Sequence, residues 1–544
     1  MALTATASSK ISASAENVWF DETMRMVQSE PDTAFVEEVS RRWHTAPEGP
    51  PVSRVDDSAD QHSRGLAAID AAGRTPPGVG SLESQEGVTV QRIIVVANRL
   101  PVSWDGEQWI ISPGGLVRAL RPVLQNAEGA WVGWAGIPDF NPEPFDYDGI
   151  DQRPVPLSED EVDSFYYGFC NGTLWPLYHD AIVAPEYHRH TWRSYVDVNR
   201  RYAEATAGVV SAGDIAWVQD YQLQLVPSML RSINPDATIG FYLHIPFPPI
   251  EVFARLPWRR QILEGLLGAD VIAFQTRQSA DNFARAARRL AGAEAVGRRD
   301  LSWRGRSVHL QPAPIAIDTA EFERMASSPA VQERAAQIRA ELGDPDHVIL
   351  GMDRLDYTKG IDLRLKAFAS LLEESPSDRH LYAFVQVAVP SREQVPAYQK
   401  LRIDIEQIVG RINGSYREPG WAPVSYLYRT LPFEEVIAYY VAADVMLVTP
   451  LRDGMNLVAK EYAACRTGND GVLILSEFAG AAEQLRSALI VNPYDIDSVV
   501  RTISYATTMP EAEQRQRMRR LRNAVRKADV FEWARDCLAT LEVL

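Results

Sequence analysis

Short runs of apolar residues recur along the chain from about residue 91, and most of them end in polar or glycine-rich sequence. The first, RIIVVANR at 92–99, is continuously apolar over five residues, and the later PGGLVRALRPVL is typical of a glycine turn that opens a helix. A continuous apolar run, rather than an alternating one, indicates a strand buried on both faces of a parallel sheet. The pattern therefore predicts a strand, a loop and a helix, the first unit of an α/β fold.

Two series of such runs follow one another. The first comprises DIAWVQDY, TIGFYLHIPFP, VIAFQ and VHLQPAPIAI, and the second comprises HVILGMDRLD, YAFVQVAVPS, PVSYLYRTL, DVMLVTPL, GVLILSEFAG and ALIVNPYD. Helical segments such as ILEGLLGA and SADNFARAARRLAG separate them. The break between the two series lies near 318–346, which predicts two doubly wound, Rossmann-like α/β domains that face one another across a cleft.

The expected domain boundaries follow from these series. We expect an acceptor-side domain over 91–318, a nucleotide-sugar-side domain over 319–510, and helices alone over 511–544, for which a return to the first domain is one arrangement. Residues 1–90 are rich in Ser, Ala, Pro, Gly and Asp, a composition typical of a mostly disordered extension. Within it, the apolar spacing of TAFVEEVSRRW at 33–43 predicts a short docking helix.

Composition and charge exclude several classes of protein. The 544 residues carry a formal charge of −17, so the field of the whole molecule repels nucleic acid and anionic membrane. Cys170, Cys465 and Cys537 lie far apart, outside any CxxC motif, so we expect neither a disulfide framework nor a metal site. No apolar stretch reaches 18 residues and the N-terminus does not have the pattern of a signal peptide, so we expect a cytoplasmic protein.

Several predicted strands end in a polar residue. Arg99, Asp220, His244 and Arg354 each end a strand, and Arg392 follows another. In open parallel sheets the functional residues gather at these carboxyl ends. A buried strand-end histidine is more often structural than catalytic, but five polar residues in one topological position favour a site.

RLDYTKG, at 354–360, places Arg354 and Lys359 on one strand-to-helix connection. Both cations can reach a single phosphate group, and the amides of the following helix add partial positive charge. An ordinary solvated loop explains the same residues equally well.

LRDGMNLVAKE, at 451–461, follows an apolar strand and opens a helix with a tight turn. Gly454 lets the backbone approach a ligand closely, Asp453 can accept hydrogen bonds from sugar hydroxyls, and Glu461 can bind a ribose diol. A capped helix explains the turn but leaves Glu461 without a role. His179, His188 and His190 lie near Asp180 without the spacing of a zinc site, so we interpret these histidines as surface or structural residues.

From Gln91 to the C-terminus the chain resembles the trehalose-6-phosphate synthase family, which are retaining glycosyltransferases of the GT-B fold. The motifs that carry the resemblance are VANRLP, SPGGL, WVGWAG, NGTLWPLYH, QDYQL, FYLHIPFP, LGMDRLDYTKG, GRINGSY, VTPLRDGMNLVAKEY, LSEFAGAA and ALIVNPYD. The family's common middle motif is HDYHL, whereas this chain has Gln219 and Gln222, a variant similar to actinobacterial members. The resemblance therefore leaves the donor open among UDP-, ADP- and GDP-glucose.

The resemblance implies a role for each matching residue. It implies a donor site of Gly115, Arg354, Lys359, Asp453, Asn456, Leu457 and Glu461, and an acceptor site of Arg99, Trp134, Tyr166, Trp175, Asp220 and Arg392. Asp220 and His244 face the reacting sugars, and Arg354 and Lys359 stabilise the leaving diphosphate. The family uses no metal or other cofactor.

The implied activity is transfer of glucose from a nucleotide-glucose to glucose 6-phosphate, giving α,α-trehalose 6-phosphate and a nucleoside diphosphate. Without an obvious carboxylate nucleophile, retention implies a front-face reaction in which the leaving phosphate accepts the acceptor's proton. The alternatives are a pseudo-glycosyltransferase that joins cyclitols through nitrogen, and a catalytically silent sugar-phosphate sensor or regulatory subunit. The expected partners are these small molecules and further copies of the chain in a homo-oligomer.

Overall fold

The computed structural model describes residues 92–104, 107–111, 117, 120, 124–125 and 129–542, all within the unit Glu86–Leu544. The expected N-terminal extension, with its helix over 33–43, and Gly115 lie outside the described residues. The two series of apolar runs form two separate sheets, as the sequence predicts.

The first sheet has ten strands in the order β10-β11-β12-β9-β8-β7-β1-β4-β6-β5. The strands from β12 to β6 in that order are parallel, and antiparallel strands complete each edge. Their bounds are β1 Ile93–Arg99, β4 Ala130–Trp134, β5 Phe145–Tyr147, β6 Ile150–Pro154, β7 Ile215–Gln219, β8 Thr238–Leu243, β9 Val271–Phe274, β10 Glu294–Ala295, β11 Asp300–Trp303 and β12 Arg306–Pro312. A separate hairpin pairs β2 (Val102–Trp104) with β3 (Trp109–Ile111).

The second sheet has six strands, all parallel, in the order β15-β14-β13-β16-β17-β18. Their bounds are β13 His347–Arg354, β14 Tyr382–Val389, β15 Val424–Leu427, β16 Val445–Val448, β17 Val472–Ser476 and β18 Leu489–Val491. The order reverses between β13 and β16, which is the switch point where open α/β sheets bind ligands.

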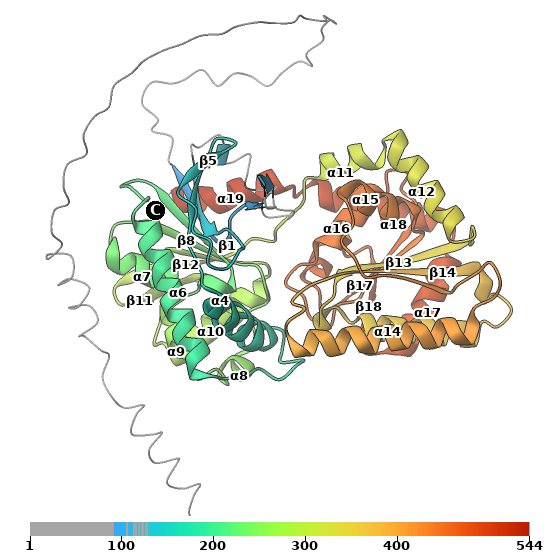
Figure 1. Ribbon diagram of the computed structural model, residues 1–544, viewed down its shortest axis with the longest axis horizontal. Coiled ribbons are helices and arrows are strands. Elements are labelled where there is room, and N and C mark those ends of the chain that lie inside the picture. The colour runs from blue at the N-terminus through green and yellow to red at the C-terminus, as the bar shows by residue number, and fades with distance from the viewer. Residues whose placement is uncertain are drawn as a thin grey trace, which may run out of the picture. The chain divides into compact units, whose positions relative to one another are not determined.

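Helices cover both faces of each sheet, so alternate residues of a strand enter different cores (Figure 1). In β1, Ile94 and Val96 face the helices of the first half, whereas Ile93 and Val95 face the opposite core. The first-half helices are α4 Glu159–Glu161, η1 Val162–Leu174, α5 Trp175–Tyr178, α6 Arg189–Ala207, η2 Tyr221–Leu223, α7 Val226–Ile233, α8 Ile250–Phe253, α9 Arg259–Leu266 and α10 Arg277–Leu290. Burial on both faces is the physical reason for the continuous apolar runs.

The second half has helices on both faces of its sheet in the same way. They are α11 Thr319–Ala326, α12 Pro329–Glu341, η3 Tyr357–Lys359, α13 Ile361–Glu374, η4 Arg379–Leu381, α14 Pro396–Tyr416, α15 Phe433–Ala442, α16 Leu457–Cys465, η5 Gly480–Glu483, α17 Ile496–Thr507 and α18 Glu511–Arg526.

The last helix, α19 (Val530–Glu542), packs on the first sheet, not the second. Figure 1 shows it, in red, beside the blue and green elements. The Trp533 ring lies 5.6 Å from that of Trp217 on β7, and its Nε1 donates to the carbonyl of Ala313 at 3.1 Å. Leu541 packs against Gly240 on β8 so closely that a Cβ there would lie 2.6 Å from its Cδ1. The domain boundaries themselves stay a prediction.

The described residues also show whether a helix could span a membrane and how the cysteines are placed. No helix among them is long and apolar enough to cross a membrane. The three cysteines are unpaired and buried.

Candidate active site

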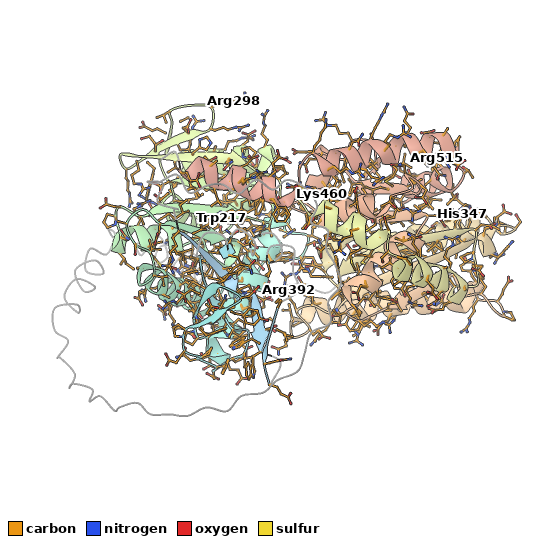
Figure 2. The ribbon with its side chains drawn as sticks, turned by 90° about the horizontal axis from the view of Figure 1, so that it is seen from above. Trp217, Arg298, His347, Arg392, Lys460 and Arg515 are labelled. Carbon is orange, nitrogen blue, oxygen red and sulfur yellow. The ribbon has the colours of Figure 1, made fainter. Side chains whose placement is uncertain are left out.

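The five polar residues at strand ends lie on the facing edges of the two sheets. Arg99 ends β1, Asp220 follows β7 and His244 follows β8 in the first half, while Arg354 ends β13 and Arg392 lies beyond β14 in the second. Figure 2 shows Arg392 where the two halves meet. Arg392 of the second half contacts Tyr221 and Trp175 of the first, so the two halves meet at this residue.

Asp220 and His244 form one cluster with Gln219. The backbone N–H of His244 donates to Asp220 Oδ1 at 3.1 Å, and the His244 Nε2 lies 3.1 Å from Gln219 Oε1. Burial raises the pKa of Asp220 to about 6, although Arg354 and Arg392 oppose that shift. Burial lowers the pKa of His244 to about 3, so its imidazole is neutral at neutral pH.

Arg392 lies across the junction and is held by residues from both halves. Its Nη1 donates to Asp356 Oδ2 at 2.9 Å and also to the hydroxyl of Tyr398, and its Nη2 donates to the Tyr221 hydroxyl at 3.3 Å. The guanidinium carbon lies 3.8 Å from the centre of the Trp175 ring, a cation–π contact. Burial opposes ionisation of Asp356, but Arg392, Arg354 and Lys359 together lower its pKa below the ordinary value.

Two buried N–H donors within this stack have no hydrogen-bond partner among the described residues. They are Nε1 of Trp175 and Nε of Arg392. An unpaired buried donor costs about 1–3 kcal/mol, so such groups mark a position built for an acceptor atom. Because the two side chains are stacked on each other, both donors belong to one small region of the site.

The second half contributes an ion pair between two predicted donor-binding residues. Lys359 Nζ donates to Asp453 Oδ2 at 2.5 Å, and Asn456 Nδ2 donates to the same oxygen at 3.1 Å. Burial alone would raise the pKa of Asp453, but Lys359 lowers it below the ordinary value. Asn456 also caps α16 by accepting from the backbone N–H of Ala459, and Leu457 is the first residue of that helix. The positive end of α16 is therefore directed at the same place as the lysine.

A fully buried arginine supports the loop that carries Lys359. Arg364 on α13 donates to Asp353 at 2.7 Å, to Thr449 Oγ1 at 3.0 Å and to the carbonyl of Lys359 at 3.3 Å. Gly360 follows at φ 65°, where a Cβ would lie 2.7 Å from the carbonyl of Thr449. The two loops that follow β13 and β16 are thus fixed to each other.

The loop that holds Asp453 also packs against the first half. A Cβ on Gly454 would lie 2.3 Å from the carbonyl oxygen of His244, so only glycine permits this approach. Arg452, on the same loop, lies 3.3 Å from Asp180 of the first half. The loop that carries the predicted donor residue Asp453 therefore lies against the strand end that carries His244.

The predicted acceptor residues of the first half flank β1 and β4. Arg99 is an exposed residue, whose guanidinium carbon lies 4.6 Å from the ring centre of Trp134 and whose Nη1 would lie 2.4 Å from a Cβ on Gly136. Tyr166 lies on η1, a thirteen-residue π-helix, and accepts at its backbone carbonyl from Asn171 at 2.7 Å. Long π-helices are rare and occur frequently at functional sites.

Glu461, on α16, accepts from the hydroxyl of Tyr440 at 2.8 Å.

Asp220, Arg392 and Asn456 also share a backbone feature. Their φ angles are 71°, 49° and 78°, in the region that non-glycine residues avoid. Such conformations cost of order 1–3 kcal/mol each and cluster at functional sites. Seven other non-glycine residues among those described also have positive φ, so this feature accompanies the site without locating it.

The sequence did not assign roles to several residues that the structure places here. Tyr221, Asp356 and Tyr398 hold Arg392, and Gln219 contacts His244. His179 is buried next to Trp175, and its Nδ1 lies 2.7 Å from the carbonyl oxygen of Trp175. Burial lowers the pKa of His179 to about 4. Tyr221 lies in the motif QDYQL and Asp356 in RLDYTKG. Their place in these motifs was the signal that could have identified them as site residues. No pattern identified Tyr398, which reaches the site from α14.

The described residues offer no cluster of three or more His, Cys, Asp or Glu side chains that could hold a metal ion. Lys359 lies beside the N-terminus of α16, because it shares the Asp453 carboxylate with Asn456, which caps that helix.

Comparisons with known proteins identify the family of the chain. The sequence model of glycosyltransferase family 20 matches residues 89–543. The chain is 54% identical over 462 residues to a trehalose-6-phosphate synthase of Mycolicibacterium smegmatis, which covers 82% of this chain and 92% of the relative. It is 53% identical over 482 residues to the trehalose-6-phosphate synthase of Mycolicibacterium paratuberculosis, covering 86% of this chain and 98% of that protein.

Solved structures are similar over the same region. A structure from E. coli bound with UDP-2-fluoro glucose superposes with a TM-score of 0.78 at 35% identity, covering 84% of this chain and 99% of the other. A UDP-forming α,α-trehalose-phosphate synthase from Burkholderia xenovorans, in complex with glucose-6-phosphate, superposes with a TM-score of 0.77 at 34% identity, covering 83% and 100%.

Proposed function

The chain belongs to glycosyltransferase family 20, and from that premise we propose that it transfers glucose from a nucleotide-glucose to glucose 6-phosphate, forming α,α-trehalose 6-phosphate. It is a glycosyltransferase of the GT-B fold. Two solved relatives, bound with UDP-2-fluoro glucose and with glucose-6-phosphate, support UDP-glucose as a donor and glucose 6-phosphate as the acceptor.

One observation carries the proposal: three cations and two buried unpaired donors converge where the halves meet. Arg354, Lys359 and Arg392 come from the second half, and Arg392 stacks on Trp175 of the first. The net charge of −17 repels anionic substrates, so these local cations must bind them.

The donor's diphosphate is assigned to Arg354, Lys359 and the N-terminus of α16 at Asn456 and Leu457. Lys359 has three N–H donors and uses one on Asp453, so two remain for phosphate oxygens. Asp453, ionised through its contact with Lys359, accepts hydroxyl groups of the transferred glucose.

On the same helix, Glu461 lies about one turn beyond Leu457 and is assigned to the ribose. Gly115 is assigned to the donor phosphates by resemblance alone.

The acceptor's phosphate is assigned to Arg99, Tyr166 and Arg392. Arg99 is exposed and keeps its guanidinium available, whereas Arg392 is fixed by Asp356 and Tyr398 and offers its unpaired Nε. Trp134 and Trp175 form the apolar sides of the acceptor pocket, and the unpaired Nε1 of Trp175 donates to the sugar phosphate.

The reaction proceeds on one face of the glucose ring. The bond from its anomeric carbon to the diphosphate breaks, the bond to the acceptor hydroxyl forms, and the hydroxyl proton moves to an oxygen of the leaving diphosphate. Negative charge accumulates on that diphosphate, and Arg354 and Lys359 stabilise it most in the transition state. Neutral His244 and ionised Asp220 orient the sugar hydroxyls, and the contact of Gly454 with His244 excludes water.

The test is turnover by the purified full chain with glucose 6-phosphate and each of UDP-, ADP- and GDP-glucose. We expect trehalose 6-phosphate and the matching nucleoside diphosphate in equal amounts. Arg354→Gln should reduce kcat more than it weakens diphosphate binding, and Arg193→Gln, an exposed arginine on α6, serves as the matched control.

Other outcomes identify the alternatives. Binding of glucose 6-phosphate without turnover of any donor would indicate a silent sensor or regulatory subunit. Turnover only with an amino-cyclitol acceptor would indicate a pseudo-glycosyltransferase. A homo-oligomer and a cytoplasmic location stay predictions.

A further inference from the structure

A cavity of about 430 Å³ lies beside the candidate active site, between other strands of the same two sheets. The first half contributes residues at the ends of β9 and β12 and Arg299 from the turn between β10 and β11, and the second half contributes residues that follow β17. Its lining includes Thr276, Arg277, Arg299, Glu483, Gln484 and Arg486. Its volume is within the range of small-molecule sites.

The cavity is lined by cations that the described residues leave unneutralised. The side chains of Arg277 and Arg299 have no hydrogen bond or ion pair to any described residue, and Arg486 donates its Nε only to the carbonyl of Glu483, at 3.1 Å. A smaller adjoining cavity of about 150 Å³ shares Arg277 and Arg299 and adds Arg298, which Figure 2 labels on the first half. Among the described lining residues, one acidic side chain lies in each cavity, Glu483 in the larger and Asp281 in the smaller.

Such a group of arginines is unexpected in a chain with 72 acidic and 55 basic residues. Guanidinium groups that are not used in ion pairs are suited to phosphate, which they bind through paired, charge-assisted hydrogen bonds. The positive end of α10, a fourteen-residue helix, begins at Arg277 and adds to the field. The amide oxygen of Gln484 is buried without a partner and offers an acceptor for a ligand hydroxyl.

The wall between this cavity and the candidate active site consists of closely packed backbone. Gly454 contacts the carbonyl of His244 on one side, and on the other side a Cβ on Gly480 would lie 2.0 Å from the carbonyl of Gly454 and 3.1 Å from Thr276. An anion bound between Arg299 and Arg486 would therefore connect the two halves next to the loop that carries Asp453.

We propose that this cavity is a second anion site, which binds a small phosphate-bearing molecule between Arg277 and Arg299 of one half and Arg486 of the other. It is separate from the transfer site and does not require the proposed function to be correct. Its consequence is that occupancy favours the arrangement in which the halves are in contact, because the ligand's charge is neutralised only there.

The test is direct binding to the full chain, measured by calorimetry with two probes, inorganic phosphate and glycerol 3-phosphate. We expect Arg299→Gln and Arg486→Gln each to weaken binding of the probe about tenfold or more, because one charge-assisted hydrogen bond is lost. Arg289→Gln, at the other end of α10, is the matched control and should leave the affinity unchanged. Tighter binding of glycerol 3-phosphate would identify a phosphate ester as the ligand class, and equal binding would identify free phosphate.

Specified results would overturn the proposal. The proposal is wrong if the wild-type chain shows no saturable binding of either probe. It is also wrong if both cavity variants keep the wild-type affinity, or if only one of them binds the probe more weakly. Loss of all binding in Arg99→Gln alone would place the anion in the transfer site instead. Because turnover is not the readout, failure here is distinguishable from failure of the proposed function.

Discussion

The ion pair between Lys359 and Asp453 leads to a quantitative prediction. Both side chains are nearly buried, at 12% and 14% exposure, and their charged atoms lie 2.5 Å apart. Lys359→Met leaves the Asp453 carboxylate buried without its cation, which typically costs about 3–5 kcal/mol. Unfolding entropy of roughly 2 cal/mol/K per residue over about 450 residues makes 1 kcal/mol worth about 1 °C, so we expect Tm to fall by about 3–5 °C at neutral pH.

The loss should depend on pH in a defined direction. In the wild-type chain the pKa of Asp453 lies below its ordinary value, so the pair contributes stability above that ordinary value and loses it as pH falls through the lowered pKa. In Lys359→Met, burial is left as the largest influence and raises the pKa of Asp453, so the carboxyl takes up a proton more readily. The Tm difference between the two proteins should therefore be largest near pH 8 and shrink as the pH is lowered to about 4.

A double-mutant cycle with Asp453→Asn provides the second measurement. The double variant should lose about 2 kcal/mol less than the sum of the single variants, because neither partner is then left alone. Lys366→Met is the matched control, since its pair with Asp362 is exposed and worth less than about 1 kcal/mol. Additive losses to within about 0.5 kcal/mol, or a Tm difference that does not change with pH, would refute this account of the pair.

Three further predictions concern catalysis. Arg99→Gln should lower kcat/KM for glucose 6-phosphate about ten- to a hundredfold and leave the slow reaction with free glucose unchanged. Tm should hardly change, because the guanidinium contacts Trp134 and Gly136 but makes no hydrogen bond or ion pair to a described residue; parallel loss with both acceptors would argue against phosphate binding. Asp220→Asn should lower kcat and remove the acidic limb near pH 6 that its raised pKa predicts in the wild-type profile; an identical limb in the variant would assign it to another group. Gly454→Ala should abolish turnover, because its Cβ would lie 2.3 Å from the carbonyl of His244; near-normal activity would show that this contact is not needed.

The sequence predicted the strands and the residues at their ends, because both follow from local pattern. Arg99, Asp220, His244 and Arg354 lie where the end of an apolar run places them. Partners that come from distant segments have no such pattern. Tyr398 reaches Arg392 from α14, where it is one of four buried residues and no motif distinguishes it from the other three.

Contacts between predicted site residues were not visible in the sequence for the same reason. Lys359 and Asp453 were assigned separately, and their pairing became visible only in three dimensions because 94 residues separate them. The phosphate role of Arg392 stays a prediction, and the sequence did not show that Asp356 and Tyr398 accept hydrogen bonds from its Nη1. Which charged side chains pair with one another depends on the packing of distant segments, and a single sequence does not show that packing.

The position of α19 has a consequence for how the chain is made. Its Trp533 packs against Trp217 and Tyr242 of the first sheet, although these strands are synthesised about 300 residues earlier. At roughly 5–20 residues per second, about 15–60 s pass between the synthesis of these strands and that of α19, which covers this apolar face of the sheet. During that interval the nascent first half presents an uncovered aromatic surface. A nascent chain that stops before residue 530 should therefore bind chaperones through the half that was completed first.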